Sequence, residues 1–244
     1  MGEFEINTDV NLDQLCETFR NDRRLRITEF LDPASAEALY HYLDKRAEWS
    51  SFLTDKGRMF ELPPEIRRNC SAGGEQRLID LAHASARDGG VAYIYDATRC
   101  FAGDAVAYVK DESILARFAD FVNSPMFLDF VRRVSGVEEL DMADAQAMRF
   151  RAGNFMTFHG GTSSLEYTKT QRAFYSYQLT PEWKAEWGGL LEFRGTAARS
   201  VEAYVPCFNC LDMFAFPQGH WVSAVSPFAG GSTYSVRGGI FAHP

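Results

Sequence analysis

The 244-residue sequence is poor in positive charge and has no long apolar run. Lysine and arginine number 25 against 33 aspartate and glutamate residues, so the formal net charge is −8. This balance excludes nucleic-acid binding through bulk positive charge, because phosphate contacts need a basic surface. No apolar stretch approaches the roughly 20 residues of a membrane-spanning helix. We therefore expect neither a nucleic-acid partner nor a membrane, and the oligomeric state is left open.

Cysteine is also scarce, and its five residues are an odd number. The first residues, MGEFEINTD, are acidic where a secretory leader would be basic and then apolar. The myristoylation pattern fails as well, because Gly2 is not followed by serine or threonine at position 6. We therefore expect a cytoplasmic protein with reduced cysteines. The Cys-x-x-Cys pair of Cys207 and Cys210 lacks the further ligands of a zinc site, so we expect a structural role for it.

The composition suits one packed domain, with 46% hydrophobic and 14% aromatic residues. Residues 1–139 are expected to be mainly helical, with short strands at 25–28 and 91–95. The helical patterns are 11–20, 32–49, 76–87, 112–121 and 125–134. From residue 140 onward, seven short β-like runs are broken by glycine, proline and small polar residues. Without repeats or a linker, the sequence predicts one α+β domain over 1–244, in which the helices of 1–139 brace a β-sandwich or barrel formed by 140–244.

Only five histidines are available for imidazole chemistry. Three of them, in expected helices or next to the C-terminal residue, are interpreted as ordinary surface or partly buried residues: His41, His83 and His243. The other two differ, because His159 ends one β run and His220 begins another. A rigid strand end can hold a metal ligand and leave the neighbouring positions open. Two histidines this far apart in the sequence are by themselves weak evidence for a metal site. The residues around them supply the stronger evidence.

Short motifs surround these two histidines and occur in a specific order. They are AGNFMTFH (152–159), Arg172, LTPEW (179–183), GGLLEF (188–193), VP (205–206), Asn209, FAFP (214–217), HWV (220–222) and Val225. In this order they resemble the prolyl-4-hydroxylase-like branch of the iron(II)/2-oxoglutarate-dependent oxygenases. The resemblance extends over residues 148–241.

The resemblance implies a double-stranded β-helix, which is a jelly-roll or cupin-like barrel with Fe(II) at its mouth and 2-oxoglutarate and O2 as co-substrates. In that family two histidines and one carboxylate hold the iron, through a His-x-Asp motif and a distal histidine. His159 and His220 match the two histidines. The carboxylate position falls at Gly161, and glycine cannot bind a metal ion.

Gly161 makes the sequence similar to the iron(II)/2-oxoglutarate halogenases, which carry glycine or alanine at this position. Without the carboxylate one position on the iron is left for a small monodentate ligand. Chloride or bromide suits that position, because a halide anion restores the charge of the missing carboxylate. The resemblance therefore implies radical chlorination of an unactivated C–H bond of a small molecule, while 2-oxoglutarate is converted to succinate.

Three other interpretations stay open. The chain is a hydroxylase of the same family if the glycine at position 161 is an engineered replacement of aspartate. It is a catalytically silent module if it binds 2-oxoglutarate or a metal ion without turnover. Finally, Glu166 in the loop after Gly161 is an alternative source of the carboxylate.

The distal carboxylate of 2-oxoglutarate calls for a cation, and arginine suits it because of its two-pronged geometry. The related hydroxylases carry a lysine or arginine shortly after the distal histidine. Here that place is a glycine turn, and the first cation is Arg237. Ser235 is expected beside it, because alternate residues of a strand share a face. Tyr177 and Asn154 are further candidates for hydrogen bonds to the co-substrate.

Three residues are candidates for contact with the substrate. Arg149 and Arg151 share strand parity with His159, so we expect their guanidinium groups at the barrel mouth, where they would suit a carboxylate or phosphate. Trp221 is the third, because it is adjacent to the distal histidine. These residues favour a small substrate that is anionic or amino-acid-like.

Overall fold

The structure is a computed structural model that describes residues 4–55, 57–99, 113–160, 170–197 and 199–242. Its helices are α1 (Leu12–Asp22), α2 (Pro33–Lys45), α3 (Pro64–Asn69), α4 (Ala72–Arg87), α5 (Ile114–Val122) and α6 (Pro125–Ser135), with a short 3-10 helix, η1 (Ala185–Trp187). Its strands are β1 (Arg24–Thr28), β2 (Ser50–Asp55), β3 (Arg58–Leu62), β4 (Tyr93–Arg99), β5 (Leu140–Ala143), β6 (Gln146–Phe150), β7 (Phe155–His159), β8 (Thr170–Leu179), β9 (Leu191–Arg194), β10 (Val201–Tyr204), β11 (Phe208–Ala215), β12 (His220–Val222) and β13 (Thr233–Ala242).

Local chemistry explains where most of the helices begin. The side chain of the residue before the helix accepts a backbone N–H at the start of α1, α2, α4, α5 and α6, which satisfies a donor that the helix cannot. Proline occupies the first turn of α2 and α6, where its missing N–H is not needed. None of the described helices is both long and apolar enough to cross a membrane.

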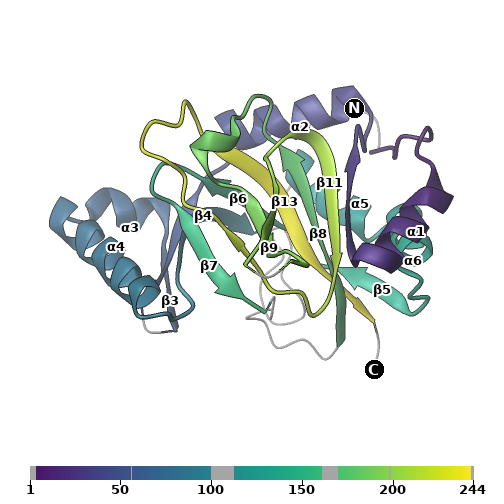
Figure 1. Ribbon diagram of the computed structural model, residues 1–244. Helices are drawn as coiled ribbons and strands as arrows, with labels where there is room; N and C mark the ends of the chain where they lie inside the picture. The colour runs from purple at the N-terminus through teal and green to yellow at the C-terminus, as the bar shows by residue number, and fades with distance from the viewer. Residues whose placement is uncertain (1–3, 56, 100–112, 161–169, 198, 243–244) are drawn as a thin grey trace.

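Thirteen of the described strands form one curled antiparallel sheet, shown face-on in Figure 1. Its main path runs β1-β11-β8-β13-β6-β4-β7-β12-β9-β10, while β2, β3 and β5 pair beside this path. Because β1 and β4 lie within the path, the first 139 residues supply part of the same sheet that the later residues build. The curl brings β7 and β12 across from the long central strands, and the site described below lies on these strands.

The outer face of the sheet packs against helices. Figure 1 shows α2, α5 and α6 along one face, with α1 next to β1. Aromatic residues fill this interface, and Tyr175 and Tyr177 of β8 meet Phe127 of α6 and Phe118 of α5. This largest apolar core fixes which side of each central strand faces the helices.

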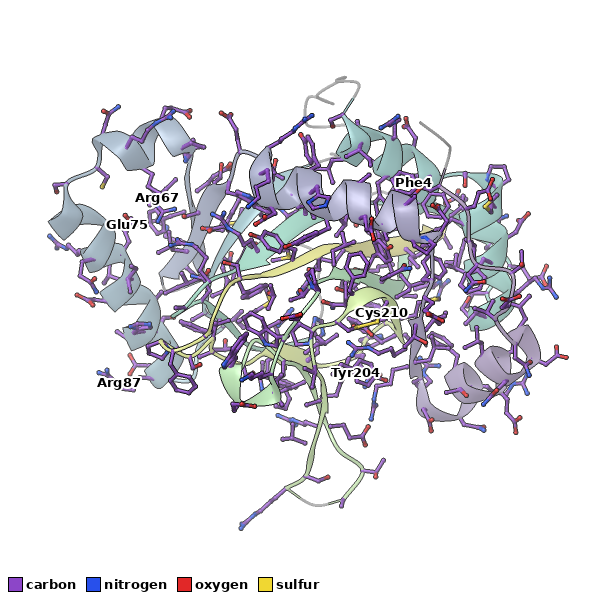
Figure 2. All side chains as sticks on the ribbon, turned by 90° about the horizontal axis from the view of Figure 1, so that it is seen from above. Phe4, Arg67, Glu75, Arg87, Tyr204 and Cys210 are labelled. Atoms are coloured by element: carbon purple, nitrogen blue, oxygen red, sulfur yellow. A yellow bond between two sulfur atoms is a disulfide. The ribbon has the colours of Figure 1, made fainter. Side chains whose placement is uncertain are left out.

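A smaller unit extends from the other side of the sheet. There α4 packs on β2 and β4 through an apolar cluster of Leu53, Leu62, Ala82 and Ile94. Figure 2 shows Arg67 and Glu75 facing each other between α3 and α4, where the Nε and Oε1 atoms are 3.0 Å apart. The sequence prediction missed β2, β3 and α3.

Side chains join the two ends of the curled sheet, β1 and β10. Arg24 forms an ion pair with Glu202. Arg26 donates from Nη1 to the carbonyl of Val205 at 2.6 Å, and its guanidinium lies 4.8 Å from the ring centre of Tyr204. Within the described residues β1 pairs only with β11 and β10 only with β9. Within the described residues, side chains of these two arginines therefore link the two ends of the sheet, and no backbone ladder joins them.

A β-bulge at Asn209 ties the sheet to the N-terminal segment. Asn209 has a φ of 55°, which asparagine tolerates better than most residues. Its amide donates to the carbonyl of Leu31 at 2.7 Å and accepts from the Leu31 N–H at 2.9 Å and from the Tyr177 hydroxyl at 2.8 Å. The bulge also brings together Cys207 and Cys210, which form a disulfide with Cα atoms 6.2 Å apart. This pairing differs from the reduced cysteines expected from the sequence.

Replacing Asn209 with alanine tests this anchor. The change removes three buried hydrogen bonds and leaves the Leu31 backbone groups and the Tyr177 hydroxyl without partners. We expect the free energy of unfolding to fall by roughly 3–5 kcal/mol, measured by urea denaturation. Tyr177→Phe is the matched control, because it removes one of the three bonds and should cost about 1 kcal/mol. Equal costs for the two variants would contradict the anchor.

Candidate metal centre

His159 and His220 face each other across the antiparallel pair of β7 and β12. Their ring centres are 4.3 Å apart. With metal–nitrogen bonds of about 2.1 Å, two imidazoles at right angles around one ion have ring centres roughly 4.5 Å apart. The histidine pair therefore fits two adjacent ligand positions of a single metal ion.

Backbone carbonyls orient both rings. Nδ1 of His159 lies 3.0 Å from the carbonyl oxygen of Thr157, and Nδ1 of His220 lies 2.9 Å from that of Gln218. Because a carbonyl only accepts, each Nδ1 carries the hydrogen and each Nε2 keeps its lone pair. Metal-binding histidines are held in this way, with the second nitrogen bonded to the protein.

Aromatic rings enclose the distal histidine. The ring centre of His220 lies 4.8 Å from Phe214, 5.7 Å from Phe174 and 6.2 Å from Phe193. His220 itself is only 5% exposed. This apolar wall keeps water away from the imidazole and restricts its orientation.

The same surroundings keep both imidazoles neutral. Burial, the neighbouring His159 and the charge of Arg237 lower the pKa of His220 to about 3, against the opposing effect of the Gln218 carbonyl. Burial also lowers the pKa of His159, and Arg237 adds to the effect, while hydrogen bonds to the backbone of Thr157 and of His220 oppose it. Neutral imidazole is the form that binds metal ions, so the donor set suits Fe(II).

Among the described residues, no group of three or more histidine, cysteine, aspartate or glutamate side chains is placed to hold a metal ion. Gly161, the position expected to lack the carboxylate, lies outside the described residues, and so does Glu166. The fit to a metal ion therefore rests on the two imidazole nitrogens.

Arg237 lies on β13, and its charge acts on both histidines. Its guanidinium lies 5.5 Å from the ring centre of Phe150, and its Nε donates to the hydroxyl of Ser235 at 3.2 Å. In the part of the chain that the structure describes, this is its one hydrogen bond, so the terminal nitrogens are available to a ligand. Burial lowers the pKa of Arg237 to about 10, against the charges of Asp212 and Tyr95, so it is charged at neutral pH.

A buried carboxylate lies in the same row of the sheet as Arg237. Asp212 and Arg237 both pair in register with Ser176, from opposite sides of β8. Arg26 binds Asp212 with two nitrogens, at 2.6 and 2.8 Å, and Gln178 donates to it at 3.0 Å. Arg26 therefore compensates Asp212 directly and leaves the charge of Arg237 for an incoming anion. The sequence reasoning missed this group, although one carboxylate within the apolar run from 210 to 216 is a signal for it.

Arg149 and Arg151 do not lie beside the histidines. Both bind the fully buried Asp96 of β4, with shortest distances of 2.7 Å from Arg149 and 2.6 Å from Arg151. Asp96 and Tyr95 are adjacent in β4 and therefore point to opposite faces of the sheet. The ring of Tyr95 packs against Phe150 on the inner face, so Asp96 points away from that face. The expected shared face fails because the register of β7 shifts between Met156 and His159, so strand parity does not continue to His159.

Tyr177 and Asn154 also occupy other places than expected. Tyr177 points to the outer face, where its ring stacks 5.4 Å from that of Phe118 and burial raises its pKa. Asn154 accepts the backbone N–H of Arg151 at 2.8 Å and so shapes the turn between β6 and β7. Tyr177 is therefore directed away from the face that carries Arg237, and Asn154 is engaged by the backbone.

Trp221 alternates with His220 in β12 and therefore lies on the opposite face of this strand. Its side chain hydrogen-bonds to Glu192, which partly offsets the rise in the Glu192 pKa caused by burial. Its ring centre is 6.0 Å from that of Phe158, over which the guanidinium of Arg194 lies at 4.2 Å. The expected contact with substrate near His220 is not supported by this orientation.

Comparison with known proteins connects the chain to one family. The sequence model described as "Oxoglutarate and iron-dependent oxygenase degradation C-term" matches residues 7–200. The match includes His159 and ends before His220 and Arg237. A search of curated proteins gave no match.

Solved structures with similar folds have very different sequences. A Pseudomonas putida prolyl-4-hydroxylase has a TM-score of 0.58 at 11% identity, over 96% of this chain and 100% of that chain. A 2OG-Fe(II) oxygenase family oxidoreductase from Burkholderia pseudomallei has a TM-score of 0.61 at 11% identity, over 100% and 97%. A Trichoplax adhaerens prolyl hydroxylase was solved in complex with a hypoxia inducible factor oxygen degradation domain peptide fragment. It has a TM-score of 0.58 at 13% identity, over 95% of this chain and 89% of that chain. These similarities confirm the predicted double-stranded β-helix.

Metal binding tests the histidine pair without any need for turnover. We expect His159→Ala and His220→Ala each to weaken Co(II) binding more than about 100-fold, because each removes a direct ligand. The visible absorption of bound Co(II) measures this affinity. His83→Ala is the control, since His83 stacks on Phe155 at 5.6 Å, away from the pair. Unchanged binding in either test variant, or equal loss in the control, would refute the assignment.

Asp96→Asn tests the assignment of the two arginines to structure. Burial raises the pKa of Asp96, but the hydrogen bond and charge of Arg151 and the charge of Arg149 outweigh it, so the net pKa is lowered. At pH 7 we expect the variant to lose about 2–4 kcal/mol of unfolding free energy, because two partly exposed arginines lose a fully buried partner.

The difference should depend on pH in one direction. The pKa of Asp96 is lower in the folded protein than in the unfolded chain, where it is about 3.9. Ionised Asp96 therefore stabilises the fold fully at pH values above about 3.9, and this stabilisation is lost as the pH falls through the folded-state pKa. Urea denaturation of both proteins at pH 7 and pH 3 measures it. Asp129→Asn, at an exposed pair with Arg132, should change stability by less than about 1 kcal/mol. A constant Asp96 effect across this range would be evidence against the interpretation.

Proposed function

Because the chain belongs to the oxoglutarate and iron-dependent oxygenase degradation C-term family, we propose that it oxidises a C–H bond of its substrate at an Fe(II) ion held by His159 and His220. The co-substrates would be 2-oxoglutarate and O2. The observation that carries the proposal is the facing pair of neutral imidazoles, each held through Nδ1 by a backbone carbonyl. Hydroxylation is the leading reaction, since the similar folds include prolyl hydroxylases.

Each residue has a defined task in this proposal. Bound Fe(II) would supply the activation of O2 that accompanies the decarboxylation of 2-oxoglutarate. His159 and His220 hold the ion, and their backbone-bonded Nδ1 atoms keep the rings oriented. Arg237 would receive the distal carboxylate of 2-oxoglutarate through its terminal nitrogens, while Ser235 holds its Nε. An arginine suits this carboxylate because its donors match the two oxygens.

The overall hydroxylation is balanced. The substrate C–H bond, O2 and 2-oxoglutarate give the alcohol, succinate and CO2, so one oxygen atom enters the substrate and the other enters succinate.

The aromatic wall of Phe174, Phe193 and Phe214 beside His220 would limit access of water to the site. With Arg149 and Arg151 bound to Asp96, no support remains for an anionic substrate. One structural relative was solved with a peptide fragment, which supports testing peptides as well as small molecules.

Halogenation is the second candidate, and the glycine at position 161 favours it. Chloride would occupy the coordination position that a carboxylate fills in hydroxylases. Compared with hydroxylation, this reaction also consumes one chloride ion and one proton and releases one water molecule. The product carries chlorine where the hydroxylated product carries a hydroxyl group. Bromide would react in the same way.

Product analysis distinguishes the two reactions. The Fe(II)-loaded protein is incubated with 2-oxoglutarate, O2 and panels of amino-acid-like molecules and proline-containing peptides, with and without chloride. We expect succinate and a product that has gained one oxygen atom, independent of chloride, and neither from His220→Ala. Mass spectrometry and succinate quantification provide the readout.

The other outcomes are equally informative. A chloride-dependent product with the isotope pattern of chlorine, abolished by Gly161→Asp, would overturn hydroxylation in favour of halogenation. Retained hydroxylation in Gly161→Asp is expected if the two-histidine site is a hydroxylase centre. Iron binding without succinate under any condition would contradict both reactions and identify a binding module.

A further inference from the structure

A groove of about 790 Å³ follows the free edge of β1, between α1 and the end of β10. The strand lies at one end of the curled sheet, and among the described strands it pairs only with β11. None of the residues that line this β1-edge groove belongs to the candidate metal centre, so the groove needs a separate explanation.

The floor of the groove offers backbone hydrogen-bonding groups. Alternate residues of β1 bond to β11, starting with the carbonyl of Arg23, which accepts from the Ala215 N–H at 2.8 Å. In an antiparallel pair the intervening residues direct N–H and C=O to the other side. These groups of Arg24, Arg26 and Thr28 therefore point toward the groove, and the described residues provide no backbone partner for them.

The wall formed by α1 is mainly polar, with Leu15 as its apolar residue. Gln14, Thr18 and Asn21 line the groove, and their spacing of three or four residues places them on one helix face. Amide and hydroxyl groups donate as well as accept hydrogen bonds. This wall suits a peptide backbone better than an apolar ligand.

The groove also has an acidic charge balance. Asp9, Asp22 and Glu29 line it, and the structure describes no ion pair for any of them among the residues that it covers. The two arginines of β1 do not offset these carboxylates, because each is already paired with another carboxylate. The complementary occupant is therefore cationic.

We propose that the β1-edge groove binds an extended, lysine- or arginine-rich segment of a partner protein, which adds to β1 as a further strand. Main-chain hydrogen bonds to the strand edge provide affinity in this mode of recognition, and side-chain contacts provide selectivity. The acidic residues select basic side chains. The proposal does not depend on the oxidation reaction, and it is tested on the metal-free protein.

The probe is a fluorescein-labelled peptide of sequence Lys-Val-Lys-Thr-Lys-Val-Lys, compared with the same peptide carrying Glu for Lys. Fluorescence anisotropy at low salt measures binding. We expect the basic peptide to bind at least about tenfold more tightly than the acidic one, and added salt to weaken it, because the attraction is between exposed charges.

Two pairs of variants locate the binding. The double change Asp22→Lys and Glu29→Lys should weaken the basic peptide about tenfold or more, whereas Glu138→Lys with Glu139→Lys, exposed residues outside the groove, should not. Thr28→Pro removes an N–H that points toward the groove and breaks no hydrogen bond between β1 and β11, so it should weaken peptide binding. Thr28→Val keeps this N–H and should retain peptide binding.

Amide hydrogen exchange followed by NMR gives the sharpest readout. Binding should slow exchange at Arg24, Arg26 and Thr28, while Leu25 and Ile27 are already protected by β11. Equal binding of both peptides, equal effects of the two charge pairs, or protection elsewhere on the molecule would each overturn the proposal. Edge protection that grows with protein concentration in the absence of peptide would assign the edge to a second copy of this chain and would overturn it as well.

Discussion

The antiparallel pairing of β7 with β12 is the constraint on which the candidate site depends. It sets His159 opposite His220 with ring centres 4.3 Å apart, although the two residues are distant in the chain. The backbone carbonyls next to each histidine then hold Nδ1, which places the hydrogen on Nδ1 and the lone pair on Nε2. A shift of one residue in this register would turn one imidazole to the opposite face of the sheet, so the long central strands and their helices matter mainly because they fix it.

The arginines near the sheet differ in whether a carboxylate of the protein pairs with them. Asp96 holds Arg149 and Arg151, and Asp212 holds Arg26 with two hydrogen bonds. Arg237 differs, because its one described hydrogen bond is to a neutral hydroxyl. Burial of a charge is costly unless it is paired, and a bound anion would complete the pairing of Arg237. This contrast, rather than the presence of an arginine alone, is the reason we propose that Arg237 binds the co-substrate.

The sequence predicted the elements that have strong local signals, such as the capped helices and the strands that carry the ordered motifs. It missed β2 and β3, because β3 is largely exposed and has no apolar alternation, and pairing with β4 and β2 holds them in the sheet. Motif order pointed to His159, His220 and Arg237. The parity argument failed for Arg149 and Arg151, because the register of β7 shifts between Met156 and His159. The sequence did not show which face of β8 is the inner one, so it gave no sign that Tyr177 lies on the outer face.

The most direct test is an anaerobic titration of the Fe(II)-loaded protein with 2-oxoglutarate, followed by the visible charge-transfer absorption of a 2-oxo acid chelated to Fe(II). The account predicts this absorption in the wild type and none in His159→Ala or His220→Ala. In Arg237→Met it predicts the same absorption only at 2-oxoglutarate concentrations at least about tenfold higher, since a charge-assisted pair is lost. An iron-loaded wild type that never develops the absorption, or an Arg237→Met variant with unchanged affinity, would contradict the account.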